Sequence, residues 1–98
     1  MTEIAELTDN EFLRQFEYKF DSQLAIIEYS LQERKIFLTK LIVPEEIDTE
    51  TLRNDFIVAV LNNIQERNLS VMPTSPSIAK FIRKNRQYKS MLPIGVRI

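Results

Sequence analysis

Pro44 separates two hydrophobic patterns in this chain of 98 residues. Before it, Phe16, Tyr18 and Phe20 alternate with charged residues, which is the period-two pattern of a half-buried strand. After it, apolar residues recur at helical spacing from residue 52 to about 67. A short chain with both patterns must pack its helices on a sheet around one core. The sequence therefore predicts a single domain of mixed α/β (α+β) class.

The segment before Pro44 predicts three strands in an antiparallel meander. They span residues 16–20, 24–31 and 36–43 and are joined by short polar turns. Apolar residues occupy both faces of the second strand, so it is expected to be covered on both sides. Residues 1–11 are polar and acidic and are predicted to form a flexible N-terminal arm, with the domain spanning residues 12–98.

The segment after Pro44 predicts two helices around a fourth strand. The first helix spans residues 52–67, with Asp48, Thr49 and Thr51 as alternative N-caps. A short strand, 69–72, follows and ends at Pro73. Ser75 is placed to cap a second helix, which carries Pro76 in its first turn and buries Ile78, Phe81 and Ile82. Residues 85–92 are expected to form a further helical turn, and residues 93–98 an extended tail.

Composition excludes several kinds of site. The chain has no cysteine and no histidine, which removes thiolate nucleophiles, disulfides, His-based triads and the common zinc sites. Its single glycine, Gly95, rules out glycine-rich phosphate loops. No apolar run approaches the ~20 residues of a membrane span, and the acidic start is unlike a signal peptide, so a cytoplasmic protein with no membrane association is expected.

Charge is distributed unevenly along the chain. Residues 1–50 hold 12 acidic and 5 basic side chains, whereas residues 51–98 hold 2 acidic and 8 basic ones. Five of these bases, with Tyr88 among them, form a run without an acid: Lys80, Arg83, Lys84, Arg86 and Lys89. This run is typical either of a surface that binds phosphates or nucleic acid, or of a solvated helical face.

Three other features have both a functional and a structural interpretation. The acidic residues 45–50 suit a hard cation, but their spacing differs from an EF-hand, and helix capping explains them better, so no metal is predicted. Glu28, on an apolar strand, is a candidate general base or simply the partner of a lysine. Ser75 has no histidine to activate it, which favours capping.

From Val43 onward the chain resembles a known family. The segments that carry the resemblance are Ile42-Val43-Pro44, the helix from Leu52, Leu69-Ser70-Val71-Met72-Pro73 and Phe81 to Leu92. In order and spacing they are similar to the small, stand-alone branch of the GNAT N-acetyltransferase superfamily, and Phe16-Glu17 and the strand from Ala25 fit its first half more loosely. The resemblance implies a GNAT-like fold and acetyl-CoA or CoA as the cofactor.

The resemblance also implies a set of cofactor contacts. The backbone at Leu41 and Val43 would pair with pantetheine. The start of the next helix would hold the pyrophosphate, with Asn85 nearby. The residues placed at that helix start are Thr49, Glu50, Thr51, Leu52 and Arg53.

Several of these positions depart from the family pattern. Thr49 and Thr51 replace the loop glycines, and Asp48 stands where a base is usual. The Pro-x-Cys motif reads Pro73-Thr74-Ser75, and Lys40 takes the place of a histidine. Carboxylates near a pyrophosphate cost roughly 1 kcal/mol each at ~4 Å in water. The sequence therefore predicts an acetyl-CoA site that is degraded.

Three functions follow as hypotheses. The first is a degenerate acetyltransferase-like domain that binds a partner or an altered ligand through its basic segment. The second is a working N-acetyltransferase on a small amine or a protein amine, with Ser75, Glu28 and Tyr88 as the catalytic candidates. The third is a polyanion binder, although the acidic first half argues against nucleic acid. The chain is expected to be a monomer or a weak homodimer.

An open cleft between the strands around Val43 and Val71 would support a ligand-binding role. Side chains of Leu52 or Arg53 filling that space would instead indicate a structural remnant.

Overall fold

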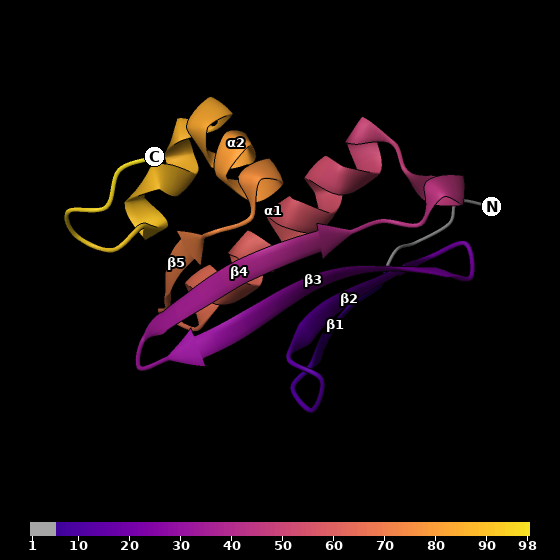
Figure 1. Cartoon of the computed structure of the whole chain (residues 1–98), viewed down its shortest axis with the longest axis horizontal. Coiled ribbons are helices and arrows are strands. Elements are labelled where there is room, and N and C mark those ends of the chain that lie inside the picture. Colours follow the sequence, from indigo (N-terminus) through magenta and orange to yellow (C-terminus); the bar gives the residue numbers. More distant parts are fainter. Residues whose placement is uncertain (1–5) are drawn as a thin grey trace.

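The computed structural model describes residues 6–98, which form a five-stranded sheet with two α-helices and two 3-10 turns (Figure 1). The strands lie side by side in chain order: β1 (Glu6–Asn10), β2 (Gln15–Phe20), β3 (Gln23–Gln32), β4 (Lys35–Ile42) and β5 (Ser70–Pro73). The first four are antiparallel, and β5 is parallel to β4. A parallel neighbour requires a crossover, and a helix supplies it, which confirms the predicted α/β class.

The helical elements after β4 are η1 (Glu45–Ile47), α1 (Glu50–Glu66), α2 (Pro76–Lys84) and η2 (Arg86–Met91). The last three follow the order expected from the sequence, whereas η1 lies in a segment for which the sequence predicts no helix. Thr49 is the N-cap of α1, because its hydroxyl accepts a hydrogen bond from the Leu52 backbone N–H at 3.0 Å. Pro76 opens α2, where its fixed backbone angle favours a helix start.

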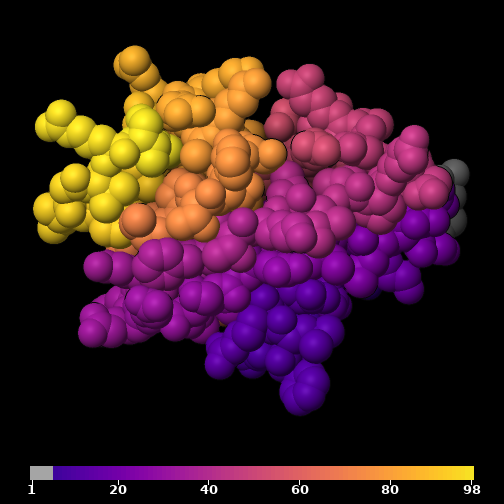
Figure 2. All heavy atoms as spheres, in the orientation of Figure 1, coloured from indigo at the N-terminus to yellow at the C-terminus, as the bar shows by residue number. Residues whose placement is uncertain are grey.

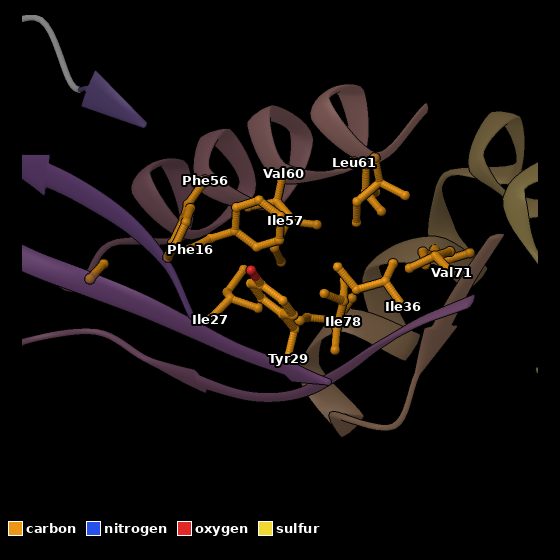
Figure 3. Packing of buried hydrophobic residues seen from close by; sticks show 14 of the residues in the cluster. Phe16, Ile27, Tyr29, Ile36, Phe56, Ile57, Val60, Leu61, Val71 and Ile78 are labelled. Carbon is orange, nitrogen blue, oxygen red and sulfur yellow. The ribbon is translucent and has the colours of Figure 1, made fainter. Parts of the chain in front are cut away.

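One hydrophobic core joins the sheet to the helices. Phe16, Ile27 and Tyr29 lie beneath the apolar face of α1 (Figure 3). In that face Phe56 is fully buried, and its ring stacks on Tyr18 with centroids 4.9 Å apart. The close packing of these large buried side chains holds α1 in its position against the sheet.

Residues 6–10 form strand β1, which corrects the prediction that residues 1–11 are an arm; residues 1–5 lie outside the described part. Polar contacts hold this strand. The Asp9 carboxylate accepts a hydrogen bond from the Tyr29 hydroxyl at 2.6 Å, and Arg67 Nη2 lies 2.7 Å from its other oxygen. Leu7, paired with Tyr18, adds apolar packing. A strand this short has too few apolar residues for its hydrophobic pattern to predict it, and its polar contacts with Tyr29 and Arg67 do not show in the sequence.

The prediction that β3 is covered on both faces is also wrong. Ala25, Ile27 and Tyr29 are buried, but Leu24 on the other face remains 39% exposed. A register shift at Glu28/Tyr29 makes Thr39 of β4 an extra, bulged residue. Beyond the bulge, Leu41 is the register partner of the buried Ile27, so Leu41 continues the core face.

Candidate functional site

The bulge in β4 lies where β4 and β5 separate. Their pairing ends at Leu38 and Pro73. At that point the Leu38 carbonyl accepts hydrogen bonds from the Ser75 backbone N–H at 2.9 Å and the Thr74 hydroxyl at 3.0 Å. The Tyr29 N–H bonds to the Arg14 carbonyl on the β2 side, so the backbone groups of the alternate β3 residues, Glu28 and Ile26, point toward β4. Their register partners Lys40 and Ile42 point back toward β3, and the backbone groups of Leu41 and Val43 therefore point to the opposite edge. This edge of β4 has no strand partner among residues 6–98.

A cleft of about 420 Å³ opens between α1 and α2. Figure 2 shows the corresponding hollow between the pink surface of α1 and the orange surface of α2. Ile57 and the half-buried Phe81 give it an apolar part. The polar lining residues are Glu50 and Arg53 from α1, and Ser77, Lys80 and Lys84 from α2. No residue of β4 or β5 lines this cleft, so it is distinct from the opening between Val43 and Val71 considered in the sequence analysis. Leu52 does not line it, and Arg53 lies at its wall with 41% of its side chain exposed.

An ion pair organises the α1 side of the cleft. The Arg53 guanidinium makes two hydrogen bonds to the Asp48 carboxylate, with N–O distances of 2.5 and 2.8 Å. These bonds lower the pKa of Asp48 and raise the pKa of Arg53. Glu50 is then the carboxylate that lines the cleft, against three cations. The cleft is less acidic than residues 45–50 suggest in the sequence.

The start of α1 offers further groups to an anion. The first N–H groups of a helix have no intrahelical acceptor, and the helix dipole is positive there. The Thr49 side chain occupies the Leu52 N–H. Among the described residues, no hydrogen bond is made by the N–H of Glu50 or Thr51. The helix start therefore keeps part of its anion-binding capacity despite the missing glycines.

A second concavity of about 400 Å³, here called the acidic pocket, lies at the end of β2 beside the start of α1. It is lined by four apolar or aromatic residues (Tyr18, Phe20, Ile47, Leu52), three acidic residues (Asp21, Glu46, Asp55), Thr49 and Thr51. Burial and the nearby Asp55 raise the pKa of Tyr18. Three residues that the resemblance assigned to the cofactor loop, Thr49, Thr51 and Leu52, thus line this pocket rather than the cleft.

The catalytic candidates are dispersed. Ser75 is buried at the N-cap position of α2, where its side chain makes no capping hydrogen bond. Glu28 is paired in register with Lys40 on the face of the sheet that α1 does not cover, and it lines neither concavity. Tyr88 packs against Phe81 with ring centroids 5.8 Å apart. The structure therefore does not bring these three side chains together.

Asn85, a predicted cofactor contact, ends α2, and its side-chain amide donates a hydrogen bond to the Phe81 carbonyl at 2.9 Å. Lys80 and Lys84 belong to the basic run found in the sequence. Their spacing of four residues predicts a shared helix face, but the sequence does not show that this face borders α1.

A family model described as GCN5-related N-acetyl-transferase matches residues 15–91. The chain belongs to this family. The match starts at β2 and ends with η2, so β1 and the last residues lie outside it. A search of curated proteins finds no match.

Members of the GCN5-related N-acetyltransferase (GNAT) family generally use acetyl-CoA. The α1–α2 cleft carries cations that fit the phosphates of such a cofactor, because Arg53, Lys80 and Lys84 line it together with Glu50, the first residue of α1. Within residues 6–98, no group of three acidic, histidine or cysteine side chains is arranged to hold a metal ion. No helix in the same range is long and apolar enough to cross a membrane.

Proposed function

We propose that this chain is a GNAT domain that binds a phosphate-bearing ligand of the CoA type in the α1–α2 cleft, with an affinity for acetyl-CoA reduced by its altered loop. The observation that carries the proposal is the charge of the cleft. Arg53, Lys80 and Lys84 line it, and Glu50 is the acidic residue facing them. In this proposal the domain acts mainly as a ligand- or partner-binding module.

The two lysines take over part of the role of the missing glycine loop. Because Lys80 and Lys84 are one helical turn apart, both side chains project from one face of α2 toward the cleft. Each ammonium within ~4 Å of a phosphate contributes about 1 kcal/mol in water, and more where water is excluded. The apolar surface of Ile57 and Phe81 suits the uncharged part of the ligand.

Two features reduce the affinity. The Thr49 hydroxyl occupies the Leu52 N–H at the helix start, and the β-carbons of Thr49 and Thr51 stand there in place of glycines, beside the cleft rather than in its lining. Arg53 is already bound to Asp48 by two hydrogen bonds, so a phosphate must compete for its guanidinium. A combined loss of 3 kcal/mol corresponds to a more than hundredfold weaker complex.

Isothermal titration calorimetry with CoA tests the proposal. We expect the full chain to bind CoA with a Kd weaker than about 10 µM, and Lys80→Ala/Lys84→Ala to weaken binding about tenfold to thirtyfold. Arg86→Ala/Lys89→Ala is the matched control, since it removes two bases of the same run that do not line the cleft. Equal losses in both double variants, or no heat at millimolar CoA, would refute the cleft as the site. Affinity at or below about 1 µM would refute the degraded loop.

Acetyl transfer is the second candidate function, and the unpaired edge of β4 favours it. No strand within residues 6–98 pairs with this edge at Leu41 and Val43, so their backbone groups can pair with an extended ligand or polarise a carbonyl. In this reaction the amine nitrogen attacks the thioester carbonyl carbon, and the C–S bond then breaks. CoA leaves as the thiol after taking up a proton, while the amine loses one to a base.

The position of Glu28 weighs against efficient transfer, because its carboxylate lies on the face of the sheet that α1 does not cover. The release of free CoA thiol across a panel of amines distinguishes the two functions. A binding module gives no release above the uncatalysed rate. Turnover that Glu28→Gln abolishes would establish the transferase instead.

A further inference from the structure

The hairpin tip between β1 and β2, defined as Phe12, Leu13 and Arg14, presents apolar side chains to solvent. Phe12 is 93% exposed and Leu13 is 56% exposed. Figures 1 and 2 show this indigo hairpin projecting away from the helices and from the rest of the surface. An exposed aromatic side chain at the end of a projection is typical of a residue that anchors a protein interface.

Hydrogen bonds hold the backbone of the hairpin tip in place. The Leu13 N–H donates to the Asn10 side-chain oxygen at 3.0 Å, and the Asn10 amide donates to Glu17 at 3.0 Å. On the other side of the tip, the Arg14 carbonyl accepts from the Tyr29 N–H at 3.0 Å. A tip that is ordered before binding loses little conformational freedom when it docks, which favours an anchoring role.

The acidic pocket complements this tip in chemistry and in size. Four of its nine lining residues are apolar or aromatic and three are acidic, and none of these nine is basic. A phenyl ring fits against the first group, and a guanidinium fits beside the carboxylates of Asp21, Glu46 and Asp55. Its volume of about 400 Å³ lies in the range of ordinary binding pockets, roughly 300–1,000 Å³.

We propose that the hairpin tip of one copy docks in the acidic pocket of a second copy, and that the exchange is reciprocal. The tip precedes β2, whereas Phe20 and Asp21 of the pocket stand at the other end of that strand. When a second copy is turned by a two-fold axis, each tip faces the pocket of its partner. The β1 strands, which form one edge of each sheet, then run antiparallel along the seam.

This inference goes beyond the proposed ligand-binding function, and it uses different residues. Phe12, Leu13 and Arg14 precede the segment that the family model matches. They line neither concavity of their own chain. Substitutions at the tip therefore leave the cleft intact, and CoA calorimetry on the same variants checks this.

Sedimentation velocity on the full chain at low salt, over a concentration series, is the test. We expect a reversible dimer whose Kd rises at least tenfold in Phe12→Ser/Leu13→Ser. Ile94→Ser is the matched control, because Ile94 is fully exposed but lies in the C-terminal tail, and it should leave the Kd unchanged. A chain that stays monomeric up to about 1 mM, or equal effects of the two variants, would overturn the proposal.

A charge exchange tests which groups meet. Arg14→Glu and Asp55→Arg should each weaken the dimer about tenfold or more, and the double variant should recover most of the loss because the ion pair is re-formed with reversed signs. Far-ultraviolet circular dichroism verifies that each variant is folded. If the double variant dimerises no better than the single ones, Arg14 and the acidic pocket do not meet. Open-ended oligomers instead of dimers would overturn the reciprocal arrangement.

Discussion

The hydrogen bond between Tyr29 and Asp9 ties strand β1 to the core, and Tyr29→Phe tests its contribution. Tyr29 is only 4% exposed, and its hydroxyl donates to the Asp9 carboxylate at 2.6 Å. Burial, followed by this hydrogen bond, raises the pKa of Tyr29 from 10.0 to about 12. The neutral phenol is therefore favoured in the folded protein, and its ionisation is linked to unfolding.

The sign and the size of the effect follow from these two pKa values. The contribution of Tyr29 is complete below pH 10 and is lost as the pH rises from 10 to about 12. Two pKa units correspond to about 2.7 kcal/mol in the free energy of unfolding. In Tyr29→Phe this alkaline loss disappears. At pH 7 the variant is about 1–2 kcal/mol less stable, since Asp9 keeps Arg67 but loses the phenol.

Urea unfolding followed by circular dichroism at pH 7, 10 and 11 measures both effects. Tyr88→Phe is the matched control, because it removes a phenol hydroxyl from η2, outside this network. The difference between the wild-type protein and each variant isolates the contribution of the substituted tyrosine from that of the rest of the chain. If Tyr29→Phe loses as much stability as the wild-type protein between pH 10 and 11, the ionisation of Tyr29 is not what links alkaline pH to unfolding.

Three further predictions concern the cleft and the core. Thr49→Gly/Thr51→Gly should tighten CoA binding about tenfold, as measured by calorimetry, and unchanged affinity would contradict the role given to the loop. The same variant should lose a few tenths of a kcal/mol or more in the free energy of unfolding, as measured in urea, because the helix cap is weaker. Asp48→Asn should also tighten CoA binding, because Arg53 is released to the ligand, and weaker binding would contradict this. Phe56→Ala should lower the free energy of unfolding by about 3–5 kcal/mol, and a loss under 1 kcal/mol would show that the Tyr18–Phe56 stack is not central.

Most of the fold is predictable because the hydrophobic period changes after Pro44 from that of strands to that of helices, and because Pro73 marks the end of the short strand β5 between the two helices. The features that the sequence does not reveal depend on contacts between distant residues. Strand β1 is held through Asp9 by Tyr29 and Arg67, which come from β3 and from the end of α1. The bulge at Thr39 involves no glycine or proline, and it becomes visible only in the register of β4 against β3.

The candidate site was predictable only in part, because it too depends on contacts between residues that are distant in the sequence. The resemblance placed Glu50 and Arg53 at the cofactor site, and both line the cleft. The basic run drew attention to Lys80 and Lys84, but only the packing of α2 beside α1 shows which bases of that run line the cleft. The ion pair between Asp48 and Arg53 changes the electrostatic expectation in two ways: it neutralises a carboxylate that the sequence counts against phosphate binding, and it occupies the guanidinium of Arg53.

Amide chemical shifts in two-dimensional NMR spectra of the ¹⁵N-labelled chain, followed during titration with CoA, test the proposal that the α1–α2 cleft holds the phosphates of a CoA-type ligand. We expect saturable shifts at Glu50 and Arg53 and along α2 from Ser77 to Lys84, with little change at Asp21 or Asp55 in the acidic pocket. Shifts centred on the acidic pocket would show that CoA binds elsewhere, and no shifts at millimolar CoA would show that it does not bind.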